Sequence, residues 1–197
     1  AYAGDDGGNL WRFDLLGATS ASWGVSYNQP LFTAPANQPI YVAPAWVPHP
    51  GDGKALPDGC VNNRTAQDLA NNDYAQQCGA MVIFGTGALL DADDKLNTNM
   101  QTIYGIWDKT PIGLPITPAF VAVSKTTNLL KQTIDTVATT GSGLSADKTF
   151  FKVSSNAIDW NTQRGWYLDL SKLPNSTGER VIGDVFNLGS NVFVSSV

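Results

Sequence analysis

The first fifteen residues read AYAGDDGGNLWRFDL and decide the fold. Residues 1–4 predict a short strand and residues 5–8 a turn, because Asp and Gly adopt the backbone angles of tight turns. Residues 9–15 alternate strictly, with Arg12 and Asp14 on one face of a second strand. The other face is apolar and is expected to pack inside: Trp11, Phe13 and Leu15. The stretch therefore predicts a β-hairpin.

Further strands are predicted where β-branched and aromatic residues cluster between turn formers. These are the predicted strands: Ile40–Ala43, Ala45–Val47, Met81–Phe84, Gln101–Trp107, Ala119–Val123, Thr149–Val153, Gly165–Leu170, Glu179–Val185 and Asn191–Val197. Residues 126–138 also fit a helix, since their apolar side chains recur at helical spacing, but their threonines favour a strand.

The composition supports a mostly β protein with many turns. Of the 17 acidic residues only Glu179 is a glutamate, and the 197 residues include 19 Gly and 11 Pro. A chain poor in Glu lacks a common helix-forming residue. The net charge of −5 argues against a nucleic-acid partner, and no run of 18 apolar residues is present that could span a membrane.

Few of the residues that catalytic sites need are present. His49 is the only histidine and lies between two prolines, so a Ser-His-Asp, Cys-His or zinc site would have to use it. We expect His49 to be a loop residue at the end of a strand. The sequence also lacks a Walker loop, a dinucleotide-binding fingerprint and an HExxH motif.

The two cysteines, Cys60 and Cys78, are predicted to form a disulfide. They enclose a polar segment, and closing a loop of this size would stabilise the fold by roughly 3 kcal/mol. A disulfide indicates an oxidising compartment. The enclosed residues, 62–77, form a distinctive insertion that we expect to face a partner.

A Trp-x-x-Asp-Leu pattern occurs at residues 11–15 and again at 166–170, with a weaker relative at 104–108. The two main copies are separated by the length of three or four propeller blades of ~40–50 residues each. In a propeller each blade buries its aromatic face on the next blade. A β-sandwich also has short aromatic strands, so both architectures remain open.

Several segments, in this order, resemble the PilC/PilY proteins of type IV pili: YAGDxxGNLWRFDL at 2–15, FGTG at 84–87, QxxYGIWD at 101–108, GWYLDL at 165–170 and GERV at 178–181. The resemblance implies an all-β fold that is part of a quinoprotein-like β-propeller. It would have about four blades of short antiparallel strands. Residues 1–197 would form a single domain, as a fragment of a larger chain.

The same resemblance implies a non-enzymatic module that promotes pilus assembly and adhesion at the pilus tip or cell surface. The implied partners are pilus subunits (minor pilins), the remainder of its own chain and a host or surface ligand. Export would pass through the periplasm. The family also has an adhesive N-terminal module and a calcium loop, which would lie upstream of Ala1; no cofactor is expected in this chain itself.

Residues 91–99 invite comparison with a calcium loop, because Asp91, Asp93, Asn97 and Asn99 fall at ligand positions. The fifth position is Lys95, however, and no glutamate supplies the bidentate ligand. We expect a solvated turn here, and no metal site in the chain.

The open alternatives are a quinoprotein dehydrogenase fragment, a scaffold propeller for outer-membrane assembly and a glycosidase that uses two Asp residues.

Among the tryptophans, three lie on alternating strands and are predicted in the blade core: Trp11, Trp107 and Trp166. The other three lie nearer turns and are predicted at the surface: Trp23, Trp46 and Trp160.

Overall fold

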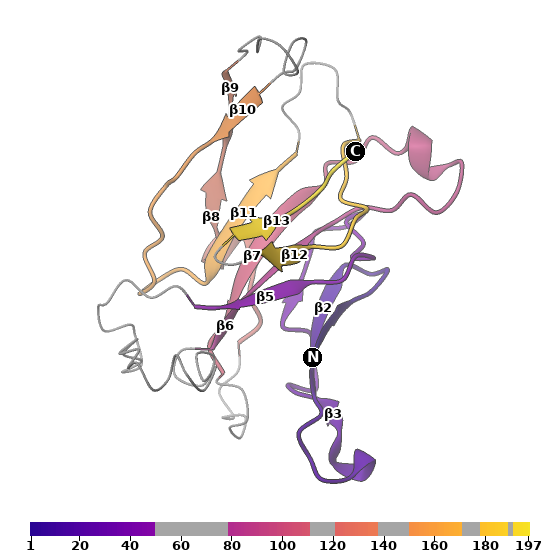
Figure 1. Cartoon of the computed structure of the whole chain (residues 1–197), viewed down its shortest axis with the longest axis vertical. Coiled ribbons are helices and arrows are strands. Elements are labelled where there is room, and N and C mark those ends of the chain that lie inside the picture. The colour runs from indigo at the N-terminus through magenta and orange to yellow at the C-terminus, as the bar shows by residue number, and fades with distance from the viewer. Residues whose placement is uncertain (50–78, 111–120, 138–149, 171–177, 189–190) are drawn as a thin grey trace.

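The computed structural model describes residues 1–49, 79–110, 121–137, 150–170, 178–188 and 191–197 (Figure 1). Strands dominate: β1 (Tyr2–Gly4), β2 (Asn9–Asp14), β3 (Gly24–Val25), β4 (Phe32–Thr33), β5 (Ala45–Pro48), β6 (Ala80–Gly85), β7 (Thr102–Asp108), β8 (Leu130–Gln132), β9 (Ile134–Val137), β10 (Phe150–Val153), β11 (Gly165–Asp169), β12 (Phe186–Leu188) and β13 (Asn191–Phe193). Helical turns are short: η1 (Ser20–Ser22), η3 (Asp94–Leu96) and α3 (Lys125–Asn128). Within these ranges, none of the helices has the length and hydropathy of a membrane span. The all-β prediction is confirmed.

The predicted hairpin is formed by β1 and β2, which pair antiparallel. Asp5 closes its turn: Oδ1 accepts the amide of Asn9 and Oδ2 accepts Nε1 of Trp11, both at 2.8 Å. Burial opposes ionisation of Asp5, but these hydrogen bonds outweigh it and lower its pKa. Gly8 completes the turn at φ 77°, where a Cβ would lie 2.6 Å from the carbonyl oxygen of Gln38.

The face of β2 that packs inside is the opposite of the one predicted. Leu10 and Arg12 are buried, whereas Trp11 is only partly buried. Leu15, the last residue of the predicted inner face, is 47% exposed. Arg12 can be buried because a carboxylate of the neighbouring sheet neutralises it, at an N–O distance of 2.8 Å. Alternation alone therefore predicted the wrong inner face.

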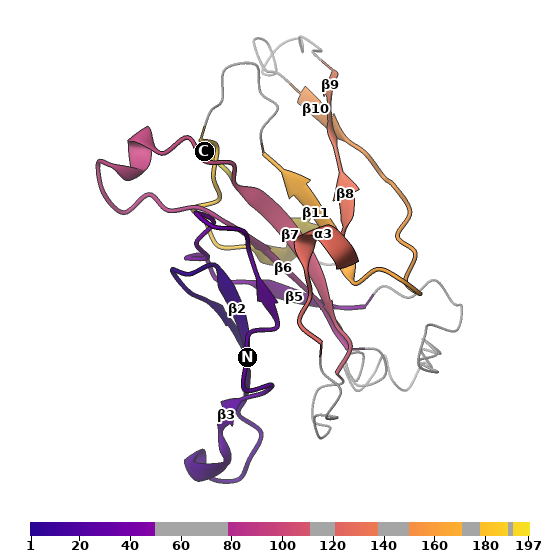
Figure 2. The same cartoon turned by 180° about the vertical axis from the view of Figure 1, so that it is seen from behind.

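Strands β3 and β4 both pair with β2 and complete a four-stranded sheet, which we call the N-terminal sheet. The second sheet, the central sheet, has five strands in the order β5-β6-β7-β11-β8 (Figure 2). Every residue of β6 is buried, as expected for a strand without polar alternation. Neighbouring strands are antiparallel except β11 and β8, which run parallel.

The copies of the repeated aromatic-Asp pattern lie in two different sheets. The copies in β7 and β11 lie on adjacent strands of one sheet, with Tyr104 opposite Tyr167. The copy in β2 lies in the other sheet. The Asp that ends the pattern holds the following turn in β2 and β7: Asp14 accepts the Leu16 amide at 3.0 Å, and Asp108 accepts that of Thr110 at 3.1 Å.

The two sheets pack together through three fully buried aromatic rings. Phe32 of β4 lies 4.7 Å from Tyr104 of β7 and 5.9 Å from Phe84 of β6, measured between ring centroids. Phe84 and Tyr104 stack at 5.3 Å. Leu10 and Val82 belong to the same buried cluster. The sheets thus bury their apolar faces on each other, as neighbouring propeller blades do.

The remaining predicted strands have mixed outcomes. The strand prediction for residues 126–138 is confirmed by β8 and β9, but residues 126–128 belong to the short helix α3 and residue 138 lies outside the described part. The strands predicted at residues 40–43 and 179–185 are not formed as strands, and each segment has an isolated β-bridge instead: Ile40 with Gly87 and Val181 with Ser196. Val123 bridges Phe32, while residues 119 and 120 lie outside the described part.

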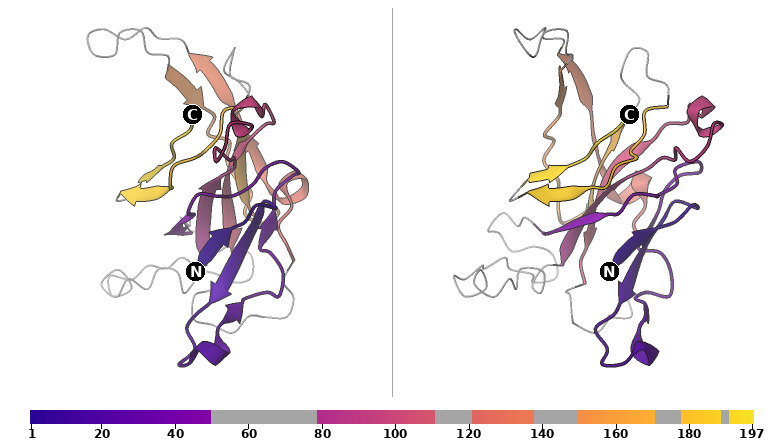
Figure 3. Two further views of the ribbon diagram at one scale, coloured as in Figure 1. Left: turned by 90° about the vertical axis from the view of Figure 1, so that its right-hand side faces the viewer. Right: turned by 45° about the vertical axis from the view of Figure 1, so that its right-hand side comes forward.

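Two hairpins complete the described structure. β9 pairs with β10, and β12 pairs with β13. Figure 3 shows the β12–β13 hairpin projecting from the side of the molecule. Among the described residues, β12 contacts β5 through Nδ2 of Asn187, which donates to the carbonyl oxygen of Trp46 at 2.8 Å, and Val192 of β13 packs in the same cluster as Ala45 of β5.

Candidate functional site

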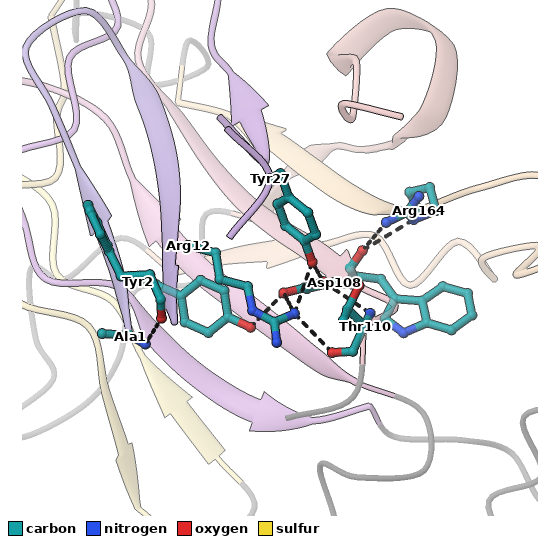
Figure 4. A network of polar contacts seen from close by, with 9 residues as sticks. Ala1, Tyr2, Arg12, Tyr27, Asp108, Thr110 and Arg164 are labelled. Carbon is teal, nitrogen blue, oxygen red and sulfur yellow. Dashed lines mark hydrogen bonds and ion pairs between the residues drawn. The ribbon is translucent and has the colours of Figure 1, made fainter. Parts of the chain in front are cut away.

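A buried carboxylate at the end of β7, Asp108, is the centre of a polar network between the two sheets (Figure 4). Its Oδ2 accepts hydrogen bonds from the Tyr2 hydroxyl and from Nη1 of Arg12, both at 2.8 Å. Its Oδ1 accepts the Tyr27 hydroxyl at 2.6 Å and the Thr110 amide at 3.1 Å. Each carboxylate oxygen therefore has two donors, which compensates for its removal from water.

Arg12 connects the same groups from the other side. Its Nη1 also donates to the Tyr27 hydroxyl at 2.9 Å and to the carbonyl oxygen of Thr110 at 3.0 Å. Tyr2 and Arg12 come from the N-terminal sheet, whereas Asp108 comes from the central sheet. We call Tyr2, Arg12, Tyr27 and Asp108 the sheet clamp, because their contacts join the two sheets.

The electrostatics of the sheet clamp suit a structural role. Burial raises the pKa of Tyr27 to about 12, and the charge of Asp108 adds to the effect. The same two causes raise the pKa of Tyr2. Burial opposes the charge of Arg12, but Asp108 together with Tyr27 and Tyr2 outweighs burial and raises the pKa of Arg12. Both hydroxyls are thus protonated donors near neutral pH, and neither is prepared to act as a base.

A groove of about 200 Å³ opens beside the sheet clamp. Its apolar lining comes from both sheets and the loops after them: Phe13, Leu15, Leu16, Pro44 and Trp46. Leu16 is 63% exposed and Trp46 is 45% exposed. Asp14 is a charged residue of the lining. A groove of this size and lining can hold an apolar side chain of a protein partner.

A second charged cluster lies on the central sheet around Asp169 of β11. Its Oδ1 accepts Nζ of Lys125 at 2.7 Å and the Thr102 hydroxyl at 2.9 Å, and Lys131 lies 3.2 Å from Oδ2. Lys125 also lies 4.6 Å from the ring centroid of Tyr167. Burial opposes ionisation of Asp169, but the contacts with Lys125 and Thr102 outweigh it and lower its pKa.

This lowered pKa predicts a pH dependence of stability. Because the folded pKa of Asp169 lies below the unfolded value, its contribution is present above about pH 4 and is lost as the pH falls through the folded pKa. Asp169→Asn should therefore flatten the fall in stability between about pH 5 and pH 2. Urea unfolding at a series of pH values measures this slope, and an unchanged slope would contradict the assignment.

Arg180 fixes a loop that projects from the central sheet, residues 88–97. Its guanidinium donates to the carbonyl oxygens of Ala88 at 2.7 Å, Asn97 at 2.5 Å and Asp94, and Nε donates to Gly178 at 2.8 Å. Arg180 is 6% exposed. A planar guanidinium suits this arrangement because it presents several donors in fixed directions.

Arg180→Lys is expected to loosen the loop, since an ammonium group cannot reach the same oxygens together. The amides of Leu96 and Asn97 form the turn hydrogen bonds of η3, to the carbonyl oxygens of Asp93 and Asp94. Their hydrogen exchange should accelerate at least about tenfold, which corresponds to about 1.4 kcal/mol. The amides of β6 serve as an internal reference. Unchanged exchange at residues 96 and 97 would show that Arg180 does not hold the loop.

The predicted tryptophan positions are partly confirmed. Trp107 is buried, and Trp23 and Trp46 are exposed as expected. Trp11, Trp160 and Trp166 are all partly buried, so neither the core prediction for Trp11 and Trp166 nor the surface prediction for Trp160 is fully met. Trp160 and Trp166 both pack against the cluster of Trp107, and the ring centroid of Trp160 lies 5.5 Å from that of Trp107.

His49 follows β5, as a strand-end residue should, but it is 1% exposed and does not lie on the surface. Its ring centroid lies 4.4 Å from that of Trp107 and 4.3 Å from that of Trp160. His49 is thus a core residue of the aromatic cluster around Trp107. Arg164 borders this cluster, and its Nη2 donates a hydrogen bond to the carbonyl oxygen of Trp107 at 2.9 Å (Figure 4).

The structure describes one of two further predicted features, the turn at residues 91–99, and does not describe the other, the disulfide. Cys60, Cys78 and the enclosed residues 62–77 lie outside the described residues, so the disulfide stays a prediction. The turn at residues 91–99 is described. Asp91 Oδ1 accepts the amides of Asp93 and Asp94, at 2.9 and 3.0 Å, and the carbonyl oxygen of Asn97 is bonded to Arg180. These hydrogen bonds order the turn, and the expectation that it holds no metal ion stays a prediction.

Reasoning from the sequence did not find the sheet clamp or the role of Arg180. The only local signal was an Asp at the end of an aromatic strand. Nothing in the alternation pairs residue 12 with residue 108, because that contact depends on how the two sheets pack. Arg180 belongs to the GERV segment, but the carbonyl oxygens that it binds come mainly from a loop about 90 residues earlier in the chain.

Comparison with known proteins places the chain in a family. Residues 1–147 match the family model described as the PilY1 beta-propeller domain. Type IV pilus biogenesis factor PilY1 of Pseudomonas aeruginosa is 32% identical over an alignment that covers 100% of this chain. A homolog of that factor in Xylella fastidiosa is 27% identical over 99% of the chain.

A solved structure agrees with these sequences. The crystal structure of the Pseudomonas aeruginosa PilY1 C-terminal domain matches 100% of this chain and 40% of that domain, with a TM-score of 0.74 and 29% identity. The chain spans 17% of the length of the Pseudomonas factor and 11% of the Xylella homolog. The fold is part of a β-propeller, and the chain belongs to the PilY1 β-propeller domain family.

Proposed function

We propose that this chain is a docking module of a type IV pilus biogenesis factor and that it acts without catalysis. The observation that carries the proposal is the match of the whole chain to proteins named as type IV pilus biogenesis factors. The geometry supports it, because Asp108, the carboxylate of the sheet clamp, is buried, has two hydrogen-bond donors on each oxygen and joins two sheets. Such a scaffold is suited to presenting loops and grooves to a partner.

The proposal also covers where the whole protein acts and what it binds. We propose that the whole protein is exported through the periplasm to the cell surface, where it promotes assembly and adhesion at the pilus tip. Its partners would be minor pilins, the rest of its own chain and a surface ligand. The calcium loop that the resemblance implies upstream of Ala1 stays a prediction, because it lies outside these 197 residues.

The test is complementation of a strain that lacks the gene, with the full-length protein supplied in trans. Electron microscopy should show few or no surface pili without the protein and normal numbers with it. Immunogold labelling of the full-length protein should place it at pilus tips. Normal pili in the deletion strain would overturn the assembly role, and label confined to the cell body would overturn the tip location.

A further inference from the structure

The loop at residues 88–97 exposes apolar side chains at a prominent position. It connects β6 to β7 and projects from the central sheet, with η3 near its tip (Figures 1 and 2). Leu90 is 70% exposed and Leu96 is 78% exposed. Leu89 is exposed as well, so three leucines gather on this protruding loop, and apolar side chains that gather at a surface mark interaction sites where single ones do not.

The loop is nevertheless ordered by many hydrogen bonds. Arg180 binds three of its carbonyl oxygens, as described above. Asp91 accepts two backbone amides of the turn, and Oδ2 of Asp94 accepts the amide of Leu90 at 2.6 Å. A loop that is already fixed in shape loses little conformational entropy when it binds, which favours recognition.

The loop also carries a strong local charge. The loop contains three aspartates, Asp91, Asp93 and Asp94, and one basic residue, Lys95. None of the three aspartates forms an ion pair with another described residue. Tyr41 extends this surface: it is 45% exposed, and its hydroxyl donates to Asp6 at 2.5 Å. That hydrogen bond raises the pKa of Tyr41, and the charge of Asp94 makes a smaller contribution in the same direction.

We propose that residues 88–97 dock into an apolar pocket bordered by Lys and Arg side chains on a protein subunit of the pilus. Leu90 and Leu96 would enter the pocket, and the aspartates would pair with its basic border. This inference rests on the proposed function and names the chemistry of the partner. It is independent of the groove beside the sheet clamp, whose lining residues lie in other segments.

The test uses the full-length protein in the deletion strain and compares two serine variants. Leu90→Ser/Leu96→Ser should reduce the number of surface pili at least about tenfold, because hot-spot residues dominate an interface. Its thermal unfolding and its amount in the cell should match the wild type. Leu188→Ser is the matched control and should keep the number of pili, since Leu188 is also exposed, at 67%, but lies on β12.

A second pair of variants tests the charge within the same loop. Asp93→Lys should lower the number of pili several-fold, because it opposes the basic border of the pocket. Lys95→Asp should leave pilus assembly intact, because it makes the loop more acidic. Both residues are exposed. Equal effects of the two substitutions would overturn the basic character of the partner.

The remaining outcomes separate this inference from the proposed function. Normal pili in the Leu90→Ser/Leu96→Ser strain would overturn the docking role of the loop and leave the assembly function standing. A fall of more than about 3 °C in the melting temperature of that variant would instead place the leucines against another part of the same protein. Normal pili in the deletion strain would overturn both.

Discussion

Asp108→Ala is expected to lower the free energy of unfolding by about 3–5 kcal/mol, which makes it one of the two most damaging substitutions considered. The carboxylate is 1% exposed and neutralises Arg12 across the boundary between the two sheets. Its removal leaves the guanidinium buried without that charge, and Tyr2 and Tyr27 lose their acceptor. Both consequences are costly because these groups lose a charged partner for which they gave up contact with water on folding.

Thermal unfolding of the full-length protein measures this effect. A loss of this size should lower the melting temperature of the transition by roughly 10 °C. Asp93→Ala is the control, because Asp93 is an exposed carboxylate with no ion pair to a described residue. We expect it to change stability by less than about 0.5 kcal/mol. Equal melting temperatures for the two variants would show that the clamp does not hold the sheets.

Phe32→Ala is the second large effect, and we expect it to cost about 3–5 kcal/mol. The ring is fully buried between Tyr104 and Phe84, so truncation leaves a cavity at the contact between the N-terminal and central sheets. Leu10, which is also fully buried in this cluster, cannot fill that volume without moving β2.

Denaturant unfolding of the full-length protein, monitored by tryptophan fluorescence, measures the loss. Leu16→Ala provides the comparison at an exposed apolar position, where less than about 0.5 kcal/mol is expected. If Phe32→Ala were as mild as Leu16→Ala, the packing of β4 against β6 and β7 would not be a source of stability.

The strands that could be predicted from sequence are those with a continuous apolar or aromatic pattern. Residues 81–84, 101–107 and 165–170 all lie in or next to observed strands of the central sheet. The hairpin at 1–15 was equally clear, because its turn residues and alternation agree. Strands β3 and β4 escaped prediction because two residues are too few to show a period.

Where prediction failed, the deciding contact came from a distant part of the chain. Residues 40–43 and 179–185 have β-forming composition but reduce to single bridges, since a strand requires a neighbour in register. The buried face of β2 depends on Asp108, which lies 96 residues beyond Arg12. The role of Arg180 likewise depends on carbonyl oxygens that tertiary packing brings within its reach.

We expect the sheet clamp to hold a docking scaffold together and to take no part in catalysis. Arg12→Met/Asp108→Asn tests this, because the amide oxygen can still accept Tyr27 and Thr110, and the amide nitrogen can donate to the Tyr2 hydroxyl oxygen, while both charges are removed. Stability within about 2 kcal/mol of the wild type is expected.

The measurement is the number of surface pili in the deletion strain carrying each full-length variant, read beside its melting temperature. We expect few pili with Asp108→Ala, which is unstable, and normal pili with Arg12→Met/Asp108→Asn, which is folded. A folded Arg12→Met/Asp108→Asn protein that assembles no pili would show that the two charges are needed for more than holding the sheets.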